Sequence, residues 1–238
     1  MKISIITATY NAVEHLPVLI KSLQEQTDQD FEWVVADGIS TDGSLDLLAK
    51  TKDLNMVITS EPDFGIYDAL NRGIKKSTGE FYLVMGADDY LYPDAIANFK
   101  KEISEQVDVL AACIYVSGKV SKPGKGRAWL RGSSGYIAGH SVGTLFRKNL
   151  HDIFGLYSNK FPIAADQLFV ISVFRVSNRI KYVSFVSGCF GSDGVSSTDL
   201  IGTTTEFFRV QLITGHNKYV QIILCFLRIL KYTLIRKV

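Results

Sequence analysis

Cysteine is scarce in this chain of 238 residues, and the three that it has, Cys113, Cys189 and Cys225, form no Cys-x-x-Cys pair. An odd number of widely spaced cysteines argues against a zinc knuckle and against a disulfide framework. The four histidines also lack metal-ligand spacing. We therefore expect reduced cysteines in a protein that stays in the cytosol.

Four longer sequence features are missing as well. Neither the glycine-rich P-loop nor the GxGxxG fingerprint is present, which argues against the standard ATPase and dinucleotide-binding classes. The N-terminus has only a short apolar run and lacks the long apolar region of a secretory signal. The longest uninterrupted apolar run of the C-terminal tail, residues 222–227, is too short to span a bilayer.

Charges of the two signs nearly balance, with 26 Lys+Arg against 24 Asp+Glu. The excess of +2 belongs to residues 218–238, which contain no acid and five basic residues: Lys218, Arg228, Lys231, Arg236 and Lys237. Without this tail the chain has 21 basic and 24 acidic side chains, or a net charge of −3. A basic surface for nucleic acid is therefore not supported. The 47% of hydrophobic residues excludes a disordered chain.

The first hundred residues alternate between strand and helix patterns. Strands are predicted at 3–8, 31–36, 55–59 and 81–85, with helices between them and a further helix up to residue 102. This alternation predicts an α/β fold with a mostly parallel sheet, and such sheets bind ligands at the carboxyl ends of their strands. Polar clusters follow these strands, so we expect them to converge on one edge: Thr9-Tyr10-Asn11, Asp37-Gly38, residues 61–65 and Asp88-Asp89.

The second half has a less regular pattern. Strands are predicted at 107–116, 142–147 and 180–190, and a helix at 164–176. Residues 117–135 and 191–205 are predicted to be loops, the first of them mobile. Basic residues without acids lie at 119–131, either on a solvated loop or in a clamp for a diphosphate-bearing substrate. His140 is interpreted as a structural histidine, with a sugar or phosphate contact as the alternative.

Three positions at the strand ends have both a structural and a chemical interpretation. Asp88 and Asp89 either cap the following helix or hold Mg²⁺ or Mn²⁺ together with substrate phosphates. Asp37 either makes an Asp-Gly turn or accepts hydrogen bonds from a nucleobase or ribose. Tyr10 either stacks on a base or packs in the core.

Four segments in order resemble family 2 glycosyltransferases of the GT-A fold, in particular those of bacterial O-antigen and surface-polysaccharide synthesis: IITATYN, VVADGISTDGS, EPDFGIYDALNRGI and GEFYLVMGADDYL. The later segment 164–168 resembles the family's acid-containing segment. The resemblance implies a Rossmann-like GT-A sheet flanked by helices. It also implies roles for individual residues: Asp166 as general base, Asp89 as metal ligand, and nucleotide-sugar contacts by Thr9, Tyr10, Asn11, Asp37, Asp68, Asn71, Arg72 and Asp88.

The implied reaction is an inverting sugar transfer from a UDP-sugar, with Mn²⁺ or Mg²⁺ as cofactor. The ion would neutralise the diphosphate leaving group, and a carboxylate would remove the proton of the attacking hydroxyl. The alternatives are a nucleotidyltransferase and a catalytically silent nucleotide-sugar-binding protein. We expect residues 1–105 to bind the nucleotide sugar and residues 106–205 to bind the acceptor, with a helical tail at 206–238.

The tail has the pattern of a basic amphipathic helix. On a helical wheel one face carries Ile222, Ile223, Phe226, Leu227, Ile229, Leu230 and Leu234, and the other carries Lys218, Gln221, Arg228, Lys231 and Arg236. This pattern favours a helix lying on an anionic membrane surface, and packing on its own domain or on a dimer partner is the alternative. Together with the resemblance, it predicts a lipid-linked diphosphate saccharide as acceptor and a peripheral location on the inner face of the cell membrane.

Overall fold

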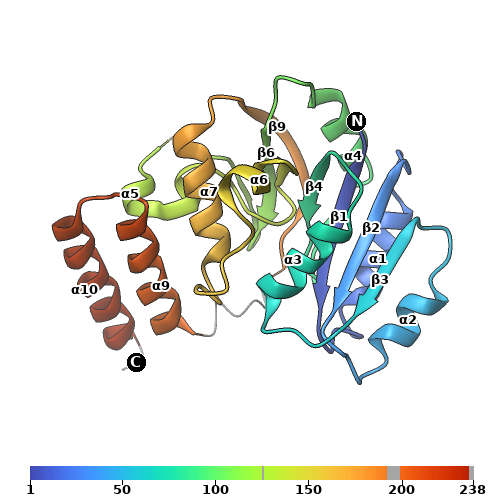
Figure 1. Ribbon diagram of the computed structural model, residues 1–238, viewed down its shortest axis with the longest axis horizontal. Helices are drawn as coiled ribbons and strands as arrows, with labels where there is room; N and C mark the ends of the chain where they lie inside the picture. The colour runs from blue at the N-terminus through green and yellow to red at the C-terminus, as the bar shows by residue number, and fades with distance from the viewer. Residues whose placement is uncertain (125, 192–198, 236–238) are drawn as a thin grey trace.

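The computed structural model describes residues 1–124, 126–191 and 199–235 (Figure 1). Lys125, Arg236 and Lys237, which belong to the two basic segments, lie outside the described residues. A nine-stranded sheet runs through the chain in the order β3-β2-β1-β4-β8-β6-β9-β5, with β7 paired to β6. Figure 1 shows β1, β2 and β3 at one end of the molecule, and the pair α9 and α10 at the other.

The first half alternates strands and helices as the sequence predicts. Its elements are β1 (Ile3–Thr9), α1 (Leu16–Gln24), β2 (Phe31–Asp37), α2 (Ser44–Lys50), β3 (Met56–Ser60), α3 (Ile66–Lys76), β4 (Phe81–Val84), β5 (Tyr90–Leu91) and α4 (Ala95–Glu102). Strands β3, β2, β1 and β4 pair in parallel. Their carboxyl ends therefore meet at one edge, and the mostly parallel α/β sheet that the sequence predicts is confirmed.

The second half completes the sheet with mixed pairing. Its elements are β6 (Val109–Val116), β7 (Lys119–Ser121), α5 (Ala128–Arg131), the 3-10 helix η1 (Gly132–Gly135), β8 (Thr144–Arg147), α6 (Leu150–Phe154), α7 (Ala165–Val176), β9 (Ile180–Cys189), α9 (Leu200–Ile213) and α10 (Lys218–Ile235). Strand β8 is antiparallel to β4 and β6, and β9 is parallel to β6. One continuous sheet thus joins the two halves.

Side chains that alternate along the strands supply two cores, one on each face of the sheet. Ile5 and Leu83 point to the face that α1, α2 and α4 cover. Ile6 and Val84, one position further along each strand, point to the face that α3, α6 and α7 cover. This period of two is what a sheet buried on both faces requires.

Two predicted loops contain regular structure, so these predictions are wrong in part. Within 117–135 the chain forms β7, α5 and η1. Strand β7 pairs with β6 through a two-residue turn in which Ser117 and Gly118 both have positive φ, 48° and 79°, the backbone that tight hairpins need. Within 191–205, α9 begins at Leu200, and the Asp199 carboxylate caps it by accepting a hydrogen bond from the Gly202 N–H.

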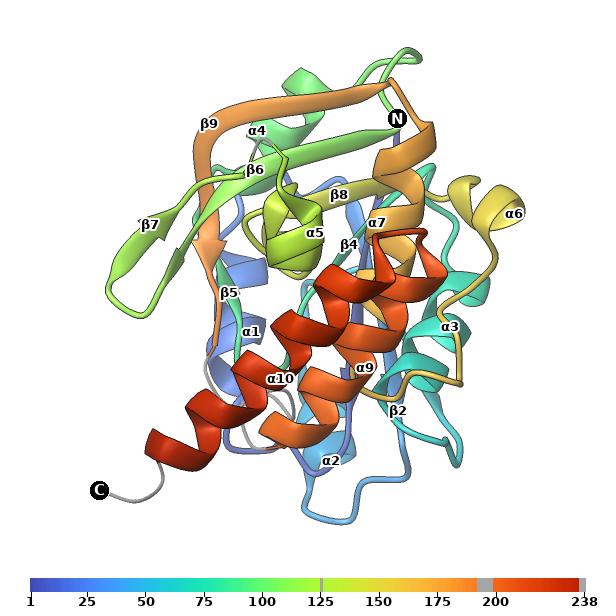
Figure 2. The same cartoon turned by 90° about the vertical axis from the view of Figure 1, so that its left-hand side faces the viewer.

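The tail folds as the expected helix, but two residues of its polar face, Gln221 and Arg228, lie against the protein. Gln221 is 1% exposed, and its Nε2 donates to the Trp129 carbonyl at 2.7 Å. The Arg228 guanidinium donates to the Leu130 carbonyl at 2.6 Å and lies over the Phe207 ring. Figure 2 shows α10 lying beside α9. The exposed large apolar side chains of α10 are Tyr219, Val220, Ile222, Ile223, Phe226, Leu227 and Leu230. The side chain of Leu234 lies outside the described part.

No helix of the described residues is both long enough and apolar enough to cross a membrane.

Candidate active site

Three acidic residues from distant parts of the sequence line one cavity of about 410 Å³. Asp88 and Asp89 follow β4, and Asp166 lies in the first turn of α7. Residues of α3 and β6 complete the wall, among them Tyr67 and Ile114. The structure thus brings the predicted metal-binding acids and the predicted general base to the same cavity.

The Asp89 carboxylate is held by two backbone N–H groups. Its Oδ1 accepts a hydrogen bond from Gly191 at 2.8 Å, and its Oδ2 accepts one from Gly86 at 2.6 Å. Asp89 is only 1% exposed, and burial raises its pKa, with the neighbouring Asp88 charge acting in the same direction. A bound cation would relieve both effects.

Glycine is required at position 191 because the chain passes directly over Asp88. A Cβ added to Gly191 would lie 1.9 Å from Asp88 Oδ2, far closer than any non-bonded contact. The strand β9 thereby delivers the Gly191 N–H to the acidic pair from the far edge of the sheet.

The donor set of this acidic pair fits a hard divalent ion. Carboxylate oxygens are the ligands that Mg²⁺ and Mn²⁺ prefer, and such ions are commonly bound by one or two carboxylates plus substrate phosphates. In the described part of the chain no three His, Cys, Asp or Glu side chains come together as a metal site. An ion beside Asp88 and Asp89 would therefore take its remaining ligands from a diphosphate and water.

Asp166 is oriented by a buried tyrosine. The Tyr67 hydroxyl donates to Asp166 Oδ1 at 2.7 Å. Burial, together with the Asp166 charge, raises the pKa of Tyr67 well above its ordinary value, so the phenol stays protonated and remains a donor. On α9, Glu206 Oε2 accepts hydrogen bonds from the N–H groups of Ile163 and Ala164, both at 2.9 Å, and so fixes the start of the helix that carries Asp166.

The first two polar clusters meet at Asp37, which is fully buried at the end of β2. Its carboxylate accepts hydrogen bonds from the Thr9, Ser40 and Ser60 hydroxyls. Burial alone would raise the pKa of Asp37, but these hydrogen bonds and the Ser40 N–H outweigh it and hold the pKa below its ordinary value. Asp37 thus orders the loops of this edge, and its contact with a base stays a prediction.

Tyr10 and Asn11 lie on the surface beside Asp37. The Tyr10 side chain is 68% exposed, as a ring that is free to stack requires, and it does not belong to the core. Asn11 has a φ of 48°, and its Oδ1 accepts a hydrogen bond from the Thr41 N–H at 2.9 Å. Its side chain therefore ties the loop after β1 to the loop after β2.

The three predicted residues of α3 have contacts within the protein. Arg72 donates to the Asp37 carbonyl at 2.6 Å, and the Asp68 carboxylate accepts from the Phe64 N–H at 3.3 Å. The Asn71 amide bonds both backbone groups of Tyr157, at 2.8 and 2.9 Å. These contacts position the loops around the cavity, while direct contact of each residue with a nucleotide sugar stays a prediction.

Sequence reasoning missed Tyr67 and Tyr157 as neighbours of the site. Tyr67 lies in the segment EPDFGIYDALNRGI, next to the predicted Asp68, so its place in that segment was a usable signal. Tyr157 lies in no such segment, and only the fold brings it beneath the cavity. His140 lines the cavity beside Asp166 and therefore belongs to the site as well.

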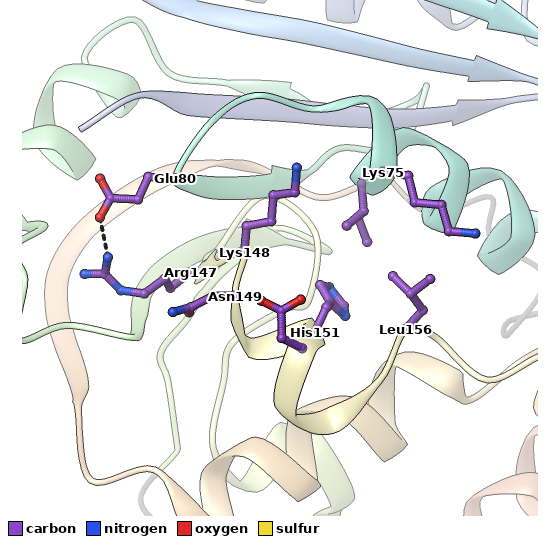
Figure 3. Close-up of a pocket in the computed structure, with 9 residues that line it drawn as sticks. Lys75, Glu80, Arg147, Lys148, Asn149, His151 and Leu156 are labelled. Atoms are coloured by element: carbon purple, nitrogen blue, oxygen red, sulfur yellow. Dashed lines mark hydrogen bonds and ion pairs between the residues drawn. The ribbon is translucent and has the colours of Figure 1, made fainter.

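A second cavity of about 710 Å³ lies under α6 (Figure 3). Its described lining residues include none of the predicted site residues. Arg147 and Glu80 form an ion pair in its wall, and His151 lines it from α6. Asp88, Asp89 and Asp166 line the acidic cavity, which is therefore the candidate active site, and none of the other predicted site residues belongs to its described lining.

Comparisons with known proteins find relatives of this chain. A PGL/p-HBAD biosynthesis glycosyltransferase of Mycobacterium bovis is 42% identical over 106 residues, which cover 43% of this chain and 41% of that relative. The chain thus spans less than half the length of that relative in the match.

Two solved structures share the fold. Staphylococcus aureus TarS 1-349 in complex with UDP-GlcNAc has a TM-score of 0.70 and 22% identity, covering 94% of this chain and 70% of that chain. The mannosyltransferase PcManGT from Pyrobaculum calidifontis, in complex with GDP-Man and Mn²⁺, has a TM-score of 0.70 and 18% identity, covering 98% and 75%. These likenesses confirm the GT-A fold that the sequence predicts. The family model described as glycosyl transferase family 2 matches residues 4–171, and the chain belongs to this family.

Proposed function

We propose that this glycosyltransferase transfers a sugar from a UDP-sugar to a hydroxyl of a lipid-linked diphosphate saccharide, with inversion at the anomeric carbon, in bacterial surface-polysaccharide or O-antigen synthesis. The observation that carries the proposal is the single cavity in which Asp88 and Asp89 accompany Asp166. In this proposal residues 1–105 bind the nucleotide sugar, residues 106–205 bind the acceptor, and residues 206–238 bind the membrane.

The residues of the cavity divide the chemistry between them. Asp89 would hold Mn²⁺ or Mg²⁺, with Asp88 beside it contacting the nucleotide sugar, and the ion would supply charge neutralisation for the departing diphosphate. Asp166, oriented by Tyr67, accepts the proton of the attacking hydroxyl. Attack on the side of the sugar opposite to the leaving group occurs in one displacement, so the configuration inverts and no covalent enzyme intermediate forms.

The donor is proposed to be a UDP-sugar bound along the edge formed by β1, β2 and α3. The exposed Tyr10 ring provides a surface for the base, and Asp37 with Thr9 orders the pocket beneath it. The TarS complex contains UDP-GlcNAc and the mannosyltransferase complex contains GDP-Man, so the fold alone does not select the base.

The catalytic proposal is tested with two variants and one control. We expect Asp166→Asn to abolish transfer while UDP-sugar binding by calorimetry is unchanged, because an amide accepts no proton at neutral pH. We expect Asp89→Ala to abolish Mn²⁺-dependent transfer. Asp152→Asn, an exposed acid outside the active-site cavity, is the control and should behave as the wild type. Transfer at the wild-type rate by Asp166→Asn would remove that residue from the mechanism.

The membrane part of the proposal rests on α10. Seven large apolar side chains of its described residues are exposed, and Ile223 and Phe226 are 60% and 65% exposed. Lys218 and Lys231 are also exposed on this helix, and Arg228 is engaged by the protein. An outward apolar face flanked by lysines suits an anionic membrane surface, and it would bring the cavity to a lipid-linked acceptor.

The membrane proposal is tested by vesicle sedimentation. Burying a large apolar side chain contributes about 1.5–3 kcal/mol, so we expect Ile223→Glu with Phe226→Glu to weaken binding to anionic vesicles at least about tenfold. Ile153→Glu changes a side chain that is 71% exposed on α6 and is the matched control. Equal vesicle binding by the double variant and the control would refute the assignment of α10.

A further inference from the structure

A continuous chain of hydrogen bonds connects the active-site cavity with the second cavity. His151 Nε2 lies 2.8 Å from the Tyr82 hydroxyl, and the Tyr82 hydroxyl lies 3.0 Å from the Tyr157 hydroxyl. The Tyr157 hydroxyl lies 2.6 Å from His140 Nε2. At the far end, His151 Nδ1 lies 3.0 Å from the Gly155 carbonyl oxygen. The chain passes through the core beside Phe146 and Phe169, whose rings pack on its members.

The Gly155 carbonyl sets the direction of every bond in this chain. A carbonyl only accepts, so His151 Nδ1 must carry the hydrogen. Burial lowers the pKa of His151, so the ring is neutral and its Nε2 accepts from Tyr82. The Tyr82 oxygen then accepts from Tyr157, and the Tyr157 oxygen accepts from His140 Nε2.

The direction fixes the tautomer of His140. With the hydrogen on Nε2, the Nδ1 atom of the neutral ring has a free lone pair and is an acceptor. Burial lowers the pKa of His140, which keeps the ring neutral. Among the hydrogen bonds of the described residues, none reaches His140 Nδ1.

His140 lines the same cavity as the proposed general base and the acidic pair. It lines the cavity together with Asp166, whose charge acts on the ring, and the next residue, Ser141, bridges to the end of β4 just before the acidic pair. Asp88, Asp89 and Asp166 line the same cavity and accept hydrogen bonds, and Ser133, Ser134, Ser141 and Gln167 also line it. A ligand group that pairs with the Nδ1 lone pair of the neutral ring must be a donor. A sugar hydroxyl is such a donor, and an ionised phosphate oxygen is not.

We propose that His140 Nδ1 accepts a hydrogen bond from a sugar hydroxyl in the active-site cavity, and that Tyr157 and Tyr82 are positioning residues that fix its tautomer. This proposal rests on the proposed function for the identity of the ligand as a sugar. The hydroxyl belongs either to the donor sugar or to the acceptor sugar, and the two sources are separated by the experiment.

The tautomer is tested directly by ¹⁵N NMR of the histidine side chains in the full chain. We expect a pyrrole-type Nε2 and a pyridine-type Nδ1 for His140, and the opposite pattern for His151. Tyr157→Phe retains the ring but removes the hydroxyl, so the His140 signals should move toward a mixture of tautomers. A pyrrole-type Nδ1 of His140 in the wild type would overturn the proposal.

The hydroxyl contact is tested with two substitutions that divide the functions of the ring. A glutamine amide reaches the place of Nε2, and an asparagine carbonyl reaches the place of Nδ1. We therefore expect His140→Gln to lose the contact and His140→Asn to retain it in part. One hydrogen bond corresponds to an effect of about 3- to 10-fold.

The probes are UDP, UDP-glucose and UDP-GlcNAc with Mn²⁺, and a polyprenyl diphosphate carrying one N-acetylglucosamine as acceptor. UDP affinity should be equal in wild type and His140→Gln. A drop for a UDP-sugar assigns the hydroxyl to the donor, and a drop in kcat/KM for the acceptor alone assigns it to the acceptor. Wild-type values of His140→Gln in both assays would overturn the inference. Absence of UDP binding by the wild type would refute the proposed function instead, and the NMR result would be unaffected.

Discussion

Removal of the Tyr67 hydroxyl should show how much of the activity depends on the orientation of Asp166, because the carboxylate itself is retained. Tyr67→Phe retains the ring, which packs on Tyr157 with centroids 5.6 Å apart, and removes the hydrogen bond of 2.7 Å to Asp166 Oδ1. A hydrogen bond to a charged group contributes about 1.5–3 kcal/mol. We expect kcat to fall by about 10- to 100-fold, because 1.4 kcal/mol corresponds to a factor of ten.

Steady-state transfer assays measure kcat for the wild type and for Tyr67→Phe, and calorimetry measures their affinity for UDP.

The control for this variant is Tyr136→Phe. Tyr136 stacks on Phe174 with centroids 4.8 Å apart and belongs to the same face of the sheet. Its variant should retain the wild-type rate, and UDP affinity should be unchanged in both variants. A Tyr67→Phe enzyme with the rate of the wild type would refute the assigned role of the hydrogen bond.

Three further changes address stability and the acidic pair. Burial would raise the pKa of Glu32, but hydrogen bonds from Ser4 and Thr78 outweigh burial and lower the pKa from 4.5 to about 2. The stabilisation of the folded protein by the Glu32 carboxylate is therefore present above pH 4.5 and is lost as the pH falls toward 2. Urea unfolding should show Glu32→Gln about 2 kcal/mol less stable at pH 7 and nearly equal to the wild type near pH 2. Gly191→Ala should reduce transfer at least about tenfold and weaken Mn²⁺ binding in a titration, because its Cβ would lie 1.9 Å from Asp88 Oδ2. Glu206→Gln should lower the thermal midpoint together with kcat, because charge-assisted hydrogen bonds to the start of α7 are weakened.

The position of the site can be predicted from the sequence because the carboxyl ends of parallel strands lie at the same edge of the sheet. Thr9 and Asp37 end neighbouring strands and are direct register partners, so their convergence depends only on strand order. The partner of Asp166 could not be predicted in the same way. Tyr67 precedes it by 99 residues, and their contact depends on how α3 and α7 pack on the same face of the sheet.

The tautomer of His140 illustrates a different limit of sequence reasoning. Its surroundings predict a buried histidine equally well as a structural or as a ligand-binding residue. The distinction depends on the hydrogen on Nδ1 of His151, which the Gly155 carbonyl fixes. His151 is separated from His140 by three hydrogen bonds. No local pattern contains that information, because each link joins residues from a different element.

The orientation of α10 follows from the unsatisfied carbonyl groups of α5. A helical wheel identifies the two faces of an amphipathic helix, but it does not determine which face turns inward. Helix α5 has only four residues, so its carbonyls lack partners within the helix and need external donors. Gln221 and Arg228 supply these donors to the carbonyls of Trp129 and Leu130. These two polar side chains are therefore used by the protein itself, and the apolar face of α10 is left outward for the membrane surface that we propose.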